Sequence, residues 1–180
     1  MNRLVFRSKP CYDIIYCIFN ILYANHRGFI RILDLTYGVG RFYRVVARKY
    51  NLFIIGVDIE KHGWEVEPDI FINDTMFAAE KYVNINNIDL IVVDPPWDNY
   101  RRGYGLYIKM KKLDRYRNAF LDPKIYIYKA MELARRHGKT LLYKYYTIPS
   151  HRKPLVLVEN IVNIFGRKGS NYYVVLEYRG

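Results

Sequence analysis

Glutamine is absent from this sequence of 180 residues, and cysteine and histidine are scarce, with two and four residues. The cysteines are six positions apart, a spacing that matches neither a zinc site nor a redox motif, and the histidines are scattered without ligand spacing. We therefore expect no metal site, and reduced thiols in a cytoplasmic protein. The lack of glutamine beside abundant Tyr, Ile, Lys and Arg is typical of a thermophilic origin. The scarce residues are Cys11, Cys17, His26, His62, His137 and His151.

Long apolar runs are also missing, since none approaches the roughly 20 residues of a membrane-spanning helix. The apolar segment 14–19 comes after basic residues, as in a signal peptide, but Pro10 and Asp13 interrupt the transition and there is no convincing cleavage site beyond it. We interpret it as part of an amphipathic helix and expect a soluble, cytoplasmic protein with no membrane partner.

Acidic residues are outnumbered: 17 Asp and Glu stand against 29 Lys and Arg, for a formal net charge of +12. Such an excess on a small domain favours a polyanionic partner, with nucleic acid first and an anionic membrane surface second. Charge alone leaves open that the excess only solvates the surface.

Short apolar runs alternate with helical patterns, which predicts an α/β fold with a mainly parallel central sheet and helices on both faces. The length suits a single domain, 1–180, and is too short for two comfortable ones. The end of the chain predicts a terminal antiparallel hairpin, 159–165 and 172–178, around the turn 167–170. The expected strands are 29–33, 52–57, 70–72, 90–93 and 140–146, and the expected helices are 10–25, 41–50, 76–82 and 123–137.

The stretch IVVDPPWDNY joins an apolar run to an acid, two prolines and a tryptophan. The run 90–93 is typical of a strand buried on both faces of a parallel sheet. Pro95 and Pro96 end such a strand and stiffen the backbone after it, because proline lacks a donor and fixes φ. Asp94 and Trp97 are then expected at the carboxyl edge of the sheet, where open α/β sheets bind ligands. A plain strand terminator accounts for only one of the prolines.

A second motif, Asp34-Leu-Thr36-Tyr-Gly38-Val-Gly40, lies between an expected strand and an expected helix. Glycines there allow the backbone to approach a ligand closely, and the N-terminus of the next helix offers unpaired N–H groups. Tyr43 stands where the dinucleotide fingerprint has its third glycine. An acid before the glycines disfavours a pyrophosphate and favours an ammonium or sulfonium, so NAD is a minor alternative.

Two further acids follow the next two expected strands. Asp58, about twenty residues after the loop, stands where a carboxylate reaches ribose hydroxyls. Asp74 could accept from the amino group of an adenine. These positions point to a nucleotide-like ligand.

In this order, the motif from Asp34 to Gly40, Asp58, Asp74 and Asp94-Pro-Pro-Trp97 resemble the class I S-adenosylmethionine-dependent methyltransferases. More narrowly, they resemble the amino-methyltransferases of the N6-adenine and N4-cytosine type, with the acid-Pro-Pro-aromatic motif as the most specific part. The resemblance runs from about Ser8 to the terminal hairpin and implies a Rossmann-like fold and S-adenosylmethionine as cofactor. Lys9, in Arg7-Ser8-Lys9-Pro10, resembles the Lys-Pro element of one class of DNA N-methylases and would lie near the cofactor carboxylate; a basic turn before a helix is the alternative. The implied cofactor-binding residues are Lys9, Asp34, Thr36, Gly38, Gly40, Asp58 and Asp74.

The resemblance also assigns roles to the motif at 94–97. The Asp94 carboxylate and the Pro95 carbonyl would accept hydrogen bonds from the two N–H groups of a base amine, and the prolines would fix where that carbonyl points. Trp97 would stack on the base, worth about 1–3 kcal/mol. A base within a duplex would have to be flipped out.

Directly after this motif, segment 98–122 interleaves cations with tyrosines. It is typical of a mobile loop that holds phosphates and stacks bases, and ordinary surface charge is the alternative. The candidate substrate-binding residues are Tyr100, Arg101, Arg102, Tyr104, Lys109 and Lys111.

Two departures from the resemblance concern the substrate. No stretch is long enough for a separate target-recognition region, so a protein partner could supply recognition. Thr36 stands where many DNA enzymes have phenylalanine, and a threonine at this position is common in RNA guanine-N2 methylases. We expect methylation of DNA at N6-adenine or N4-cytosine; the alternatives are an RNA base N-methyltransferase (N6-adenine or N2-guanine) and a non-catalytic nucleic-acid-binding module. The charge disfavours a small-molecule methyltransferase.

Overall fold

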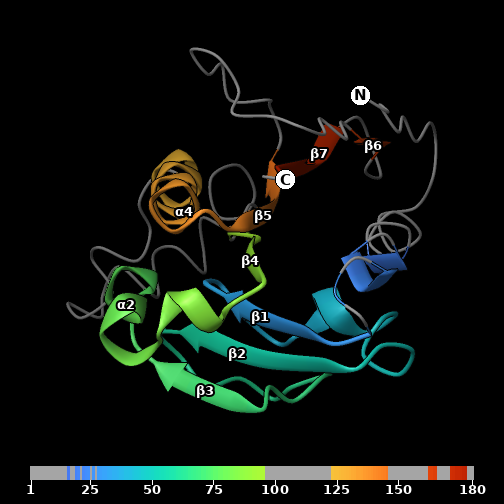
Figure 1. The fold of residues 1–180 in the computed structure, drawn as a ribbon, viewed down its shortest axis with the longest axis horizontal. Helices are drawn as coiled ribbons and strands as arrows, with labels where there is room; N and C mark the ends of the chain where they lie inside the picture. The colour runs from blue at the N-terminus through green and yellow to red at the C-terminus, as the bar shows by residue number, and fades with distance from the viewer. Residues whose placement is uncertain are drawn as a thin grey trace, which may run out of the picture.

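A computed structural model describes residues 16, 19–20, 22–24, 26, 28–95, 123–145, 162–165 and 171–177. Within these ranges, seven strands form one sheet in the order β3-β2-β1-β4-β5-β7-β6 (Figure 1). All pairs from β3 to β5 are parallel, whereas β7 pairs antiparallel with both β5 and β6. The strands are β1 (Ile30–Asp34), β2 (Leu52–Asp58), β3 (Ile70–Asn73), β4 (Leu90–Val93), β5 (Thr140–Tyr145), β6 (Val162–Phe165) and β7 (Asn171–Glu177).

The predicted mainly parallel α/β fold is confirmed, and each expected parallel strand lies within one residue of its predicted start. The turn proposed at 167–170 lies outside the described residues, so the terminal hairpin as a unit stays a prediction. The strand order reverses between β1 and β4, because β2 and β3 lie to one side of β1 and β4 and β5 to the other. Open α/β sheets bind ligands at such a switch point, beyond the carboxyl ends of the strands.

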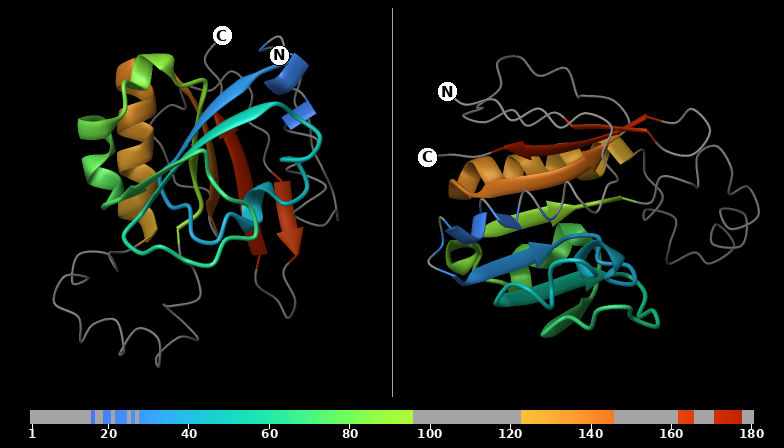
Figure 2. Two further views of the ribbon diagram at one scale, coloured as in Figure 1. Left: turned by 90° about the horizontal axis from the view of Figure 1, so that it is seen from below. Right: turned by 90° about the vertical axis from the view of Figure 1, so that its right-hand side faces the viewer.

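Apolar residues cover both faces of the sheet. Because successive strand residues point to opposite faces, β1 and β2 contribute to two separate cores. One core packs against α4 (Pro123–His137) and α2 (Ala79–Tyr82), and the other packs against Phe19 and Leu22 and the segment 37–50. Figure 2 shows α4 and α2 together on one side of the sheet and the described N-terminal helical residues on the other. β4 is wholly buried, as predicted for a strand covered on both faces.

The α-helix predicted over 41–50 is wrong. The chain forms only a 3₁₀ turn, η1 (Arg41–Tyr43), and then a series of turns to Lys49. Gly40 precedes it in the left-handed region and provides no side-chain cap, and the β-branched Val45 and Val46 are poor helix formers. The helix expected over 76–82 is likewise divided into η2 (Met76–Ala78) and α2, and a further turn, η3 (Ile85–Asn87), was not predicted.

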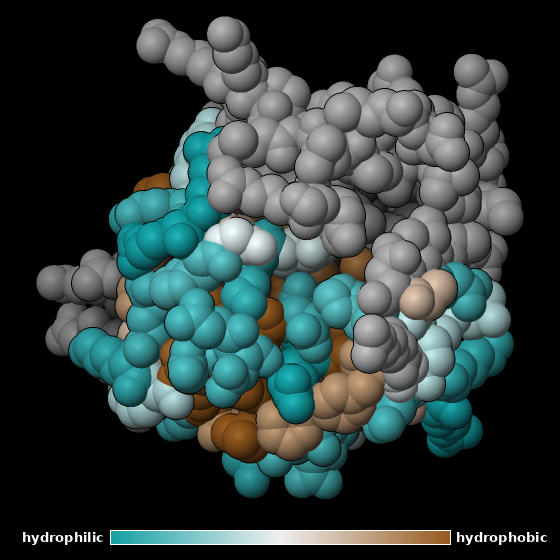
Figure 3. Space-filling model, viewed as in Figure 1, coloured by the Kyte–Doolittle hydropathy of each residue, from teal (hydrophilic) through white to brown (hydrophobic). Residues whose placement is uncertain are grey.

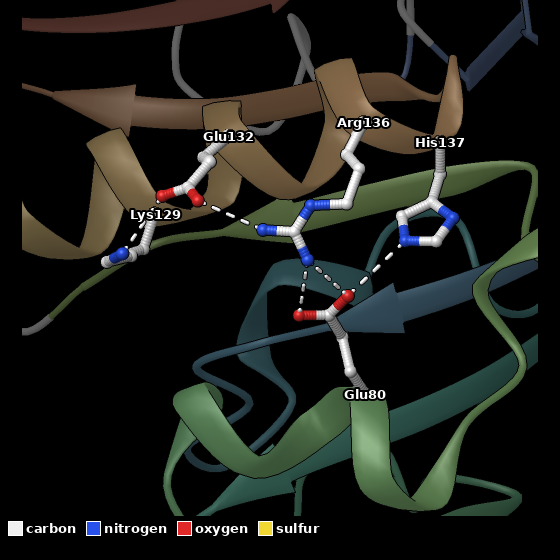
Figure 4. Close-up of polar contacts among 5 residues, drawn as sticks. All are labelled: Glu80, Lys129, Glu132, Arg136 and His137. Atoms are coloured by element: carbon white, nitrogen blue, oxygen red, sulfur yellow. Dashed lines mark hydrogen bonds and ion pairs between the residues drawn. The ribbon is translucent and has the colours of Figure 1, made fainter.

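Ion pairs hold the last turn of α4 to α2 (Figure 4). Arg136 lies 2.8 Å from Oε1 of Glu80 and 3.0 Å from Oε1 of Glu132, and Nε2 of His137 lies 3.3 Å from Glu80. Gly138, with φ of 62°, then ends the helix as predicted. These contacts are exposed, so they orient the helix more than they stabilise it.

One face of the molecule is largely polar where the structure describes it (Figure 3). Figure 3 shows hydrophilic residues over most of the described part of one face, with apolar residues gathered toward the edge where Figure 1 places β3. Ile70, at the start of that strand, is 46% exposed. No helix in the described ranges has the length and apolar character needed to span a bilayer.

Candidate active site

Four aspartates mark the carboxyl ends of four neighbouring strands. Asp34 and Asp58 are the last residues of β1 and β2, and Asp74 and Asp94 come directly after β3 and β4. Because these strands are parallel and adjacent, the four acids lie along one edge of the sheet, on both sides of the switch point. The structure thus brings together the four acids that the sequence singled out.

Asp34 is the buried member of this group, with only 2% of its surface exposed. Its Oδ1 accepts a hydrogen bond of 2.9 Å from the backbone of Thr36, and its Oδ2 accepts one of 2.7 Å from the hydroxyl of Tyr43. Burial raises the pKa of Asp34 from 3.8 to about 7, and the charges of Asp94 and Asp58 add to the rise. The two hydrogen bonds lower the pKa, but burial prevails. This carboxyl group therefore titrates near neutral pH. A neighbouring cation would stabilise its ionised form.

Two stacked tyrosines, Tyr37 and Tyr43, lie beside Asp34. The rings of Tyr37 and Tyr43 are stacked, with centroids 5.7 Å apart, and the Tyr37 hydroxyl donates a 2.7 Å hydrogen bond to the carbonyl of Val66. Burial raises the pKa of Tyr43 well above its usual value, so its hydroxyl is protonated and donates to Asp34. Sequence reasoning marked Tyr43 only as a missing glycine and did not identify it as the partner of Asp34.

The two glycines of the loop serve different purposes. Both have positive φ, 58° at Gly38 and 72° at Gly40. A Cβ added to Gly40 would lie 2.4 Å from the carbonyl oxygen of Val66, so this glycine allows the chain to pack closely on itself. A Cβ added to Gly38 would meet nothing within 4 Å, and the Gly38 amide donates a 2.8 Å hydrogen bond to Oδ2 of Asp58. Gly38 therefore has an open side next to one of the acids.

Asp94 is connected to the glycine loop through its backbone. Its amide donates a 2.8 Å hydrogen bond to the side-chain oxygen of Thr36. Pro95, the next residue, is buried. The start of the Asp-Pro-Pro-Trp motif is therefore fixed against the loop after β1.

Asp74 lies at the far end of the row and is partly exposed. Its Oδ2 accepts a 2.8 Å hydrogen bond from the hydroxyl of Tyr82, and its Oδ1 accepts one of 2.6 Å from the amide of Thr75. The bond from Tyr82, first, and that from Thr75 lower the pKa of Asp74, so it is an anion at neutral pH. Tyr82, which is 59% exposed, was not identified from the sequence.

The remaining predicted site residues lie outside the described ranges. Among the residues that the structure describes, no group of three or more His, Cys, Asp or Glu side chains could hold a metal ion. The predictions left outside are Lys9, Pro96, Trp97, Tyr100, Arg101, Arg102, Tyr104, Lys109 and Lys111.

Comparisons with known proteins bear on the fold. No protein-family model and no curated protein matches the chain. It is similar to an rRNA methylase from Streptococcus thermophilus, with a TM-score of 0.51 and 15% identity over 92% of this chain and 96% of that one. A conserved hypothetical protein from Streptococcus pyogenes gives a TM-score of 0.52 with 14% identity, over 91% and 94% of the two chains. A candidate methylase from Haemophilus influenzae gives 0.51 with 12% identity, over 92% and 89%. The chain therefore has the Rossmann-like fold of class I methyltransferases, as predicted.

Proposed function

We propose that this protein is an S-adenosylmethionine-dependent methyltransferase that modifies an exocyclic base amine of nucleic acid. The observation that carries the proposal is the row of four aspartates at the carboxyl ends of β3, β2, β1 and β4, in which Asp94-Pro95 is bonded to the glycine loop. A non-catalytic module would need neither the row nor that bond.

The described residues fit the cofactor. Asp34 is a buried acid whose anion is favoured by a neighbouring cation, and the ligand carries both an ammonium and a sulfonium. Each oxygen of Asp34 accepts one hydrogen bond and retains capacity for another. We assign Asp58 to the ribose hydroxyls, Asp74 to the adenine amino group and the open side of Gly38 to close approach of the ligand.

When bound, the cofactor supplies an electrophilic methyl group. An exocyclic amine is a poor nucleophile because its lone pair is delocalised into the ring. The Asp94 carboxylate and the Pro95 carbonyl would accept hydrogen bonds from its two N–H groups and direct the nitrogen lone pair out of the ring plane. Positive charge would grow on the nitrogen as its bond to the methyl group forms and the bond from that methyl to sulfur breaks, so these acceptors would bind the transition state more tightly than the ground state. The methylated nitrogen is acidic and would then release one N–H proton to solvent.

The sequence favours DNA as the substrate, with adenine N6 first, and two observations bring RNA level with it. Thr36 is common in RNA guanine-N2 methylases, and one of the similar structures is that of an rRNA methylase. Both substrates present a planar exocyclic amine, so the chemistry assigned to Asp94 and Pro95 is the same for either.

Methyl transfer from labelled S-adenosylmethionine tests the proposal. Duplex DNA, single-stranded DNA, transfer RNA and ribosomal RNA would be offered separately, with identification of the modified nucleoside. We expect label in one nucleoside, lost in Asp94→Ala and in the isosteric Asp94→Asn. Glu132→Gln, an exposed acid on α4, should transfer as the wild type does.

Two results would count against the proposal. Absence of cofactor binding would overturn it outright. Cofactor binding without transfer to any nucleic acid would favour a non-catalytic module or an enzyme that depends on a protein partner.

A further inference from the structure

Thr36 bridges two of the aspartates. Its backbone amide donates to Oδ1 of Asp34 at 2.9 Å, and its side-chain oxygen accepts from the backbone amide of Asp94 at 2.8 Å. One residue of the glycine loop is thereby bonded both to the acid at the end of β1 and to the acid directly after β4.

The hydrogen bond from the Asp94 amide to Thr36 lies just beyond the point where the backbone pairing of β1 and β4 ends. β1 and β4 pair in register up to Asp34 and Val92, and the amide of Leu35 still donates a 2.9 Å bond to the carbonyl of Val92. The amide of Asp94, two residues further on, donates to the Thr36 side chain. This side chain therefore anchors the backbone where the chain leaves β4.

This anchoring affects where the acceptor groups lie. The Asp94 carboxylate and the Pro95 carbonyl are attached to backbone that begins at the amide held by Thr36, and Pro95 has no N–H with which to make a compensating bond. The Pro95 ring also restricts the backbone of Asp94. A rotation at Asp94 would move both acceptors together.

We propose that Thr36 is a positioning residue that orients Asp94 and Pro95 from within the glycine loop. This inference rests on the proposed function for its catalytic consequence, because it concerns the acceptors of the base amine. It gives Thr36 a role beyond contact with the cofactor. The glycine loop would bind S-adenosylmethionine and would also orient the Asp94 carboxylate and the Pro95 carbonyl, which bind the base amine.

Two substitutions separate this role from others. Thr36→Val has nearly the same shape but lacks the oxygen that accepts from Asp94, and it keeps the backbone amide that donates to Asp34. Thr36→Ser keeps the oxygen and loses only a methyl group. The valine variant should therefore disturb Asp94 and leave the surroundings of Asp34 unchanged, and the serine variant should restore the wild-type behaviour.

The first measurement is hydrogen exchange of the Asp94 amide by NMR on the uniformly labelled full chain. We expect slow exchange in the wild type and in Thr36→Ser, and fast exchange in Thr36→Val. Equal protection in all three proteins would overturn the inference, because another group would then hold the amide. Thermal unfolding of each variant shows that the comparison is between folded proteins.

The second measurement is steady-state kinetics with the nucleic acid that accepts methyl groups. In Thr36→Val we expect kcat to fall by on the order of a hundred-fold, the loss typical of small misplacements in an active site, and this fall should exceed any rise in the KM for S-adenosylmethionine. An unchanged kcat beside rapid Asp94 exchange would overturn the positioning role. If the wild type transfers to no substrate, that result counts against the proposed function as set out above, and the exchange result still decides whether Thr36 orients Asp94.

Discussion

The hydroxyl of Tyr43 donates a 2.7 Å hydrogen bond to Oδ2 of Asp34, and both side chains are buried. Opposing effects act on this carboxyl group, because burial raises its pKa and the bond from Tyr43 lowers it. Burial is the larger effect, so the pKa is about 7 and the anion is held in the folded protein at a cost. Such a cost is typical of functional sites, where a charged ligand can recover it.

Replacing Asp34 with asparagine should remove a pH-dependent loss of stability. The folded pKa of about 7 exceeds the ordinary value of 3.8, so the folded state binds more protons than the unfolded state between these values. The free energy of unfolding of the wild type therefore falls as pH rises through this window and stays lowered above it. We expect Asp34→Asn to gain stability relative to the wild type between about pH 4 and about pH 7, as measured by urea unfolding at several pH values. Parallel stability profiles for the two proteins would contradict this prediction.

Replacing Tyr43 with phenylalanine should shift cofactor binding to higher pH. The change keeps the ring beside Tyr37 but removes the bond that lowers the pKa of Asp34, so Asp34 ionises at higher pH. Because a cationic ligand binds more tightly to the ionised form of Asp34, affinity for S-adenosylmethionine should rise with pH in both proteins. In Tyr43→Phe this rise should occur at higher pH than in the wild type. Calorimetric titration over a pH series measures this, and the titration of the ligand itself cancels in the comparison. Coincident profiles would show that Asp34 does not face the cation.

The sequence was sufficient to predict the sheet and the row of acids. Runs such as 90–93, short and wholly apolar, are typical of buried strands, and Asp34, Asp58 and Asp94 directly end or follow such runs. Because parallel strands end at one edge, placing the strands also placed these acids.

The contacts behind the row could not be predicted in this way. The partnership of Tyr43 with Asp34 depends on the turns that replace the expected helix over 41–50, and a helical pattern gave no indication of them. Gly56 carried an unused signal, since a glycine within a strand marks a close approach of other atoms. A Cβ there would lie 2.6 Å from the ring of Tyr37.

The two loop glycines should respond differently to alanine. At Gly40 the new Cβ would lie 2.4 Å from a backbone oxygen at positive φ, so overpacking of about 1–3 kcal/mol adds to backbone strain. At Gly38 only the strain, about 1–2 kcal/mol, applies, because the added atom meets open space. We expect Gly40→Ala to lower the melting temperature more, and Gly38→Ala to lose more cofactor affinity than its stability change explains. Gly38→Ala that binds S-adenosylmethionine as the wild type does would show that the ligand does not approach on this side.

The basic segment 98–122 should make nucleic-acid binding depend steeply on salt. Each cation that neutralises a phosphate contributes about 0.9 to the slope of log K against log salt concentration for duplex DNA, and about 0.7 for single strands. Replacing Arg101 and Arg102 together with alanine should therefore weaken binding and reduce the slope by up to twice that amount. Fluorescence anisotropy at a series of salt concentrations measures both quantities, and Lys129→Ala combined with Arg48→Ala, at two exposed positions elsewhere, is the matched loss of two positive charges. A slope that changes equally in both variants would mean that the segment acts only through net charge, whereas a change confined to the arginine variant would place phosphates next to the Asp-Pro-Pro-Trp motif.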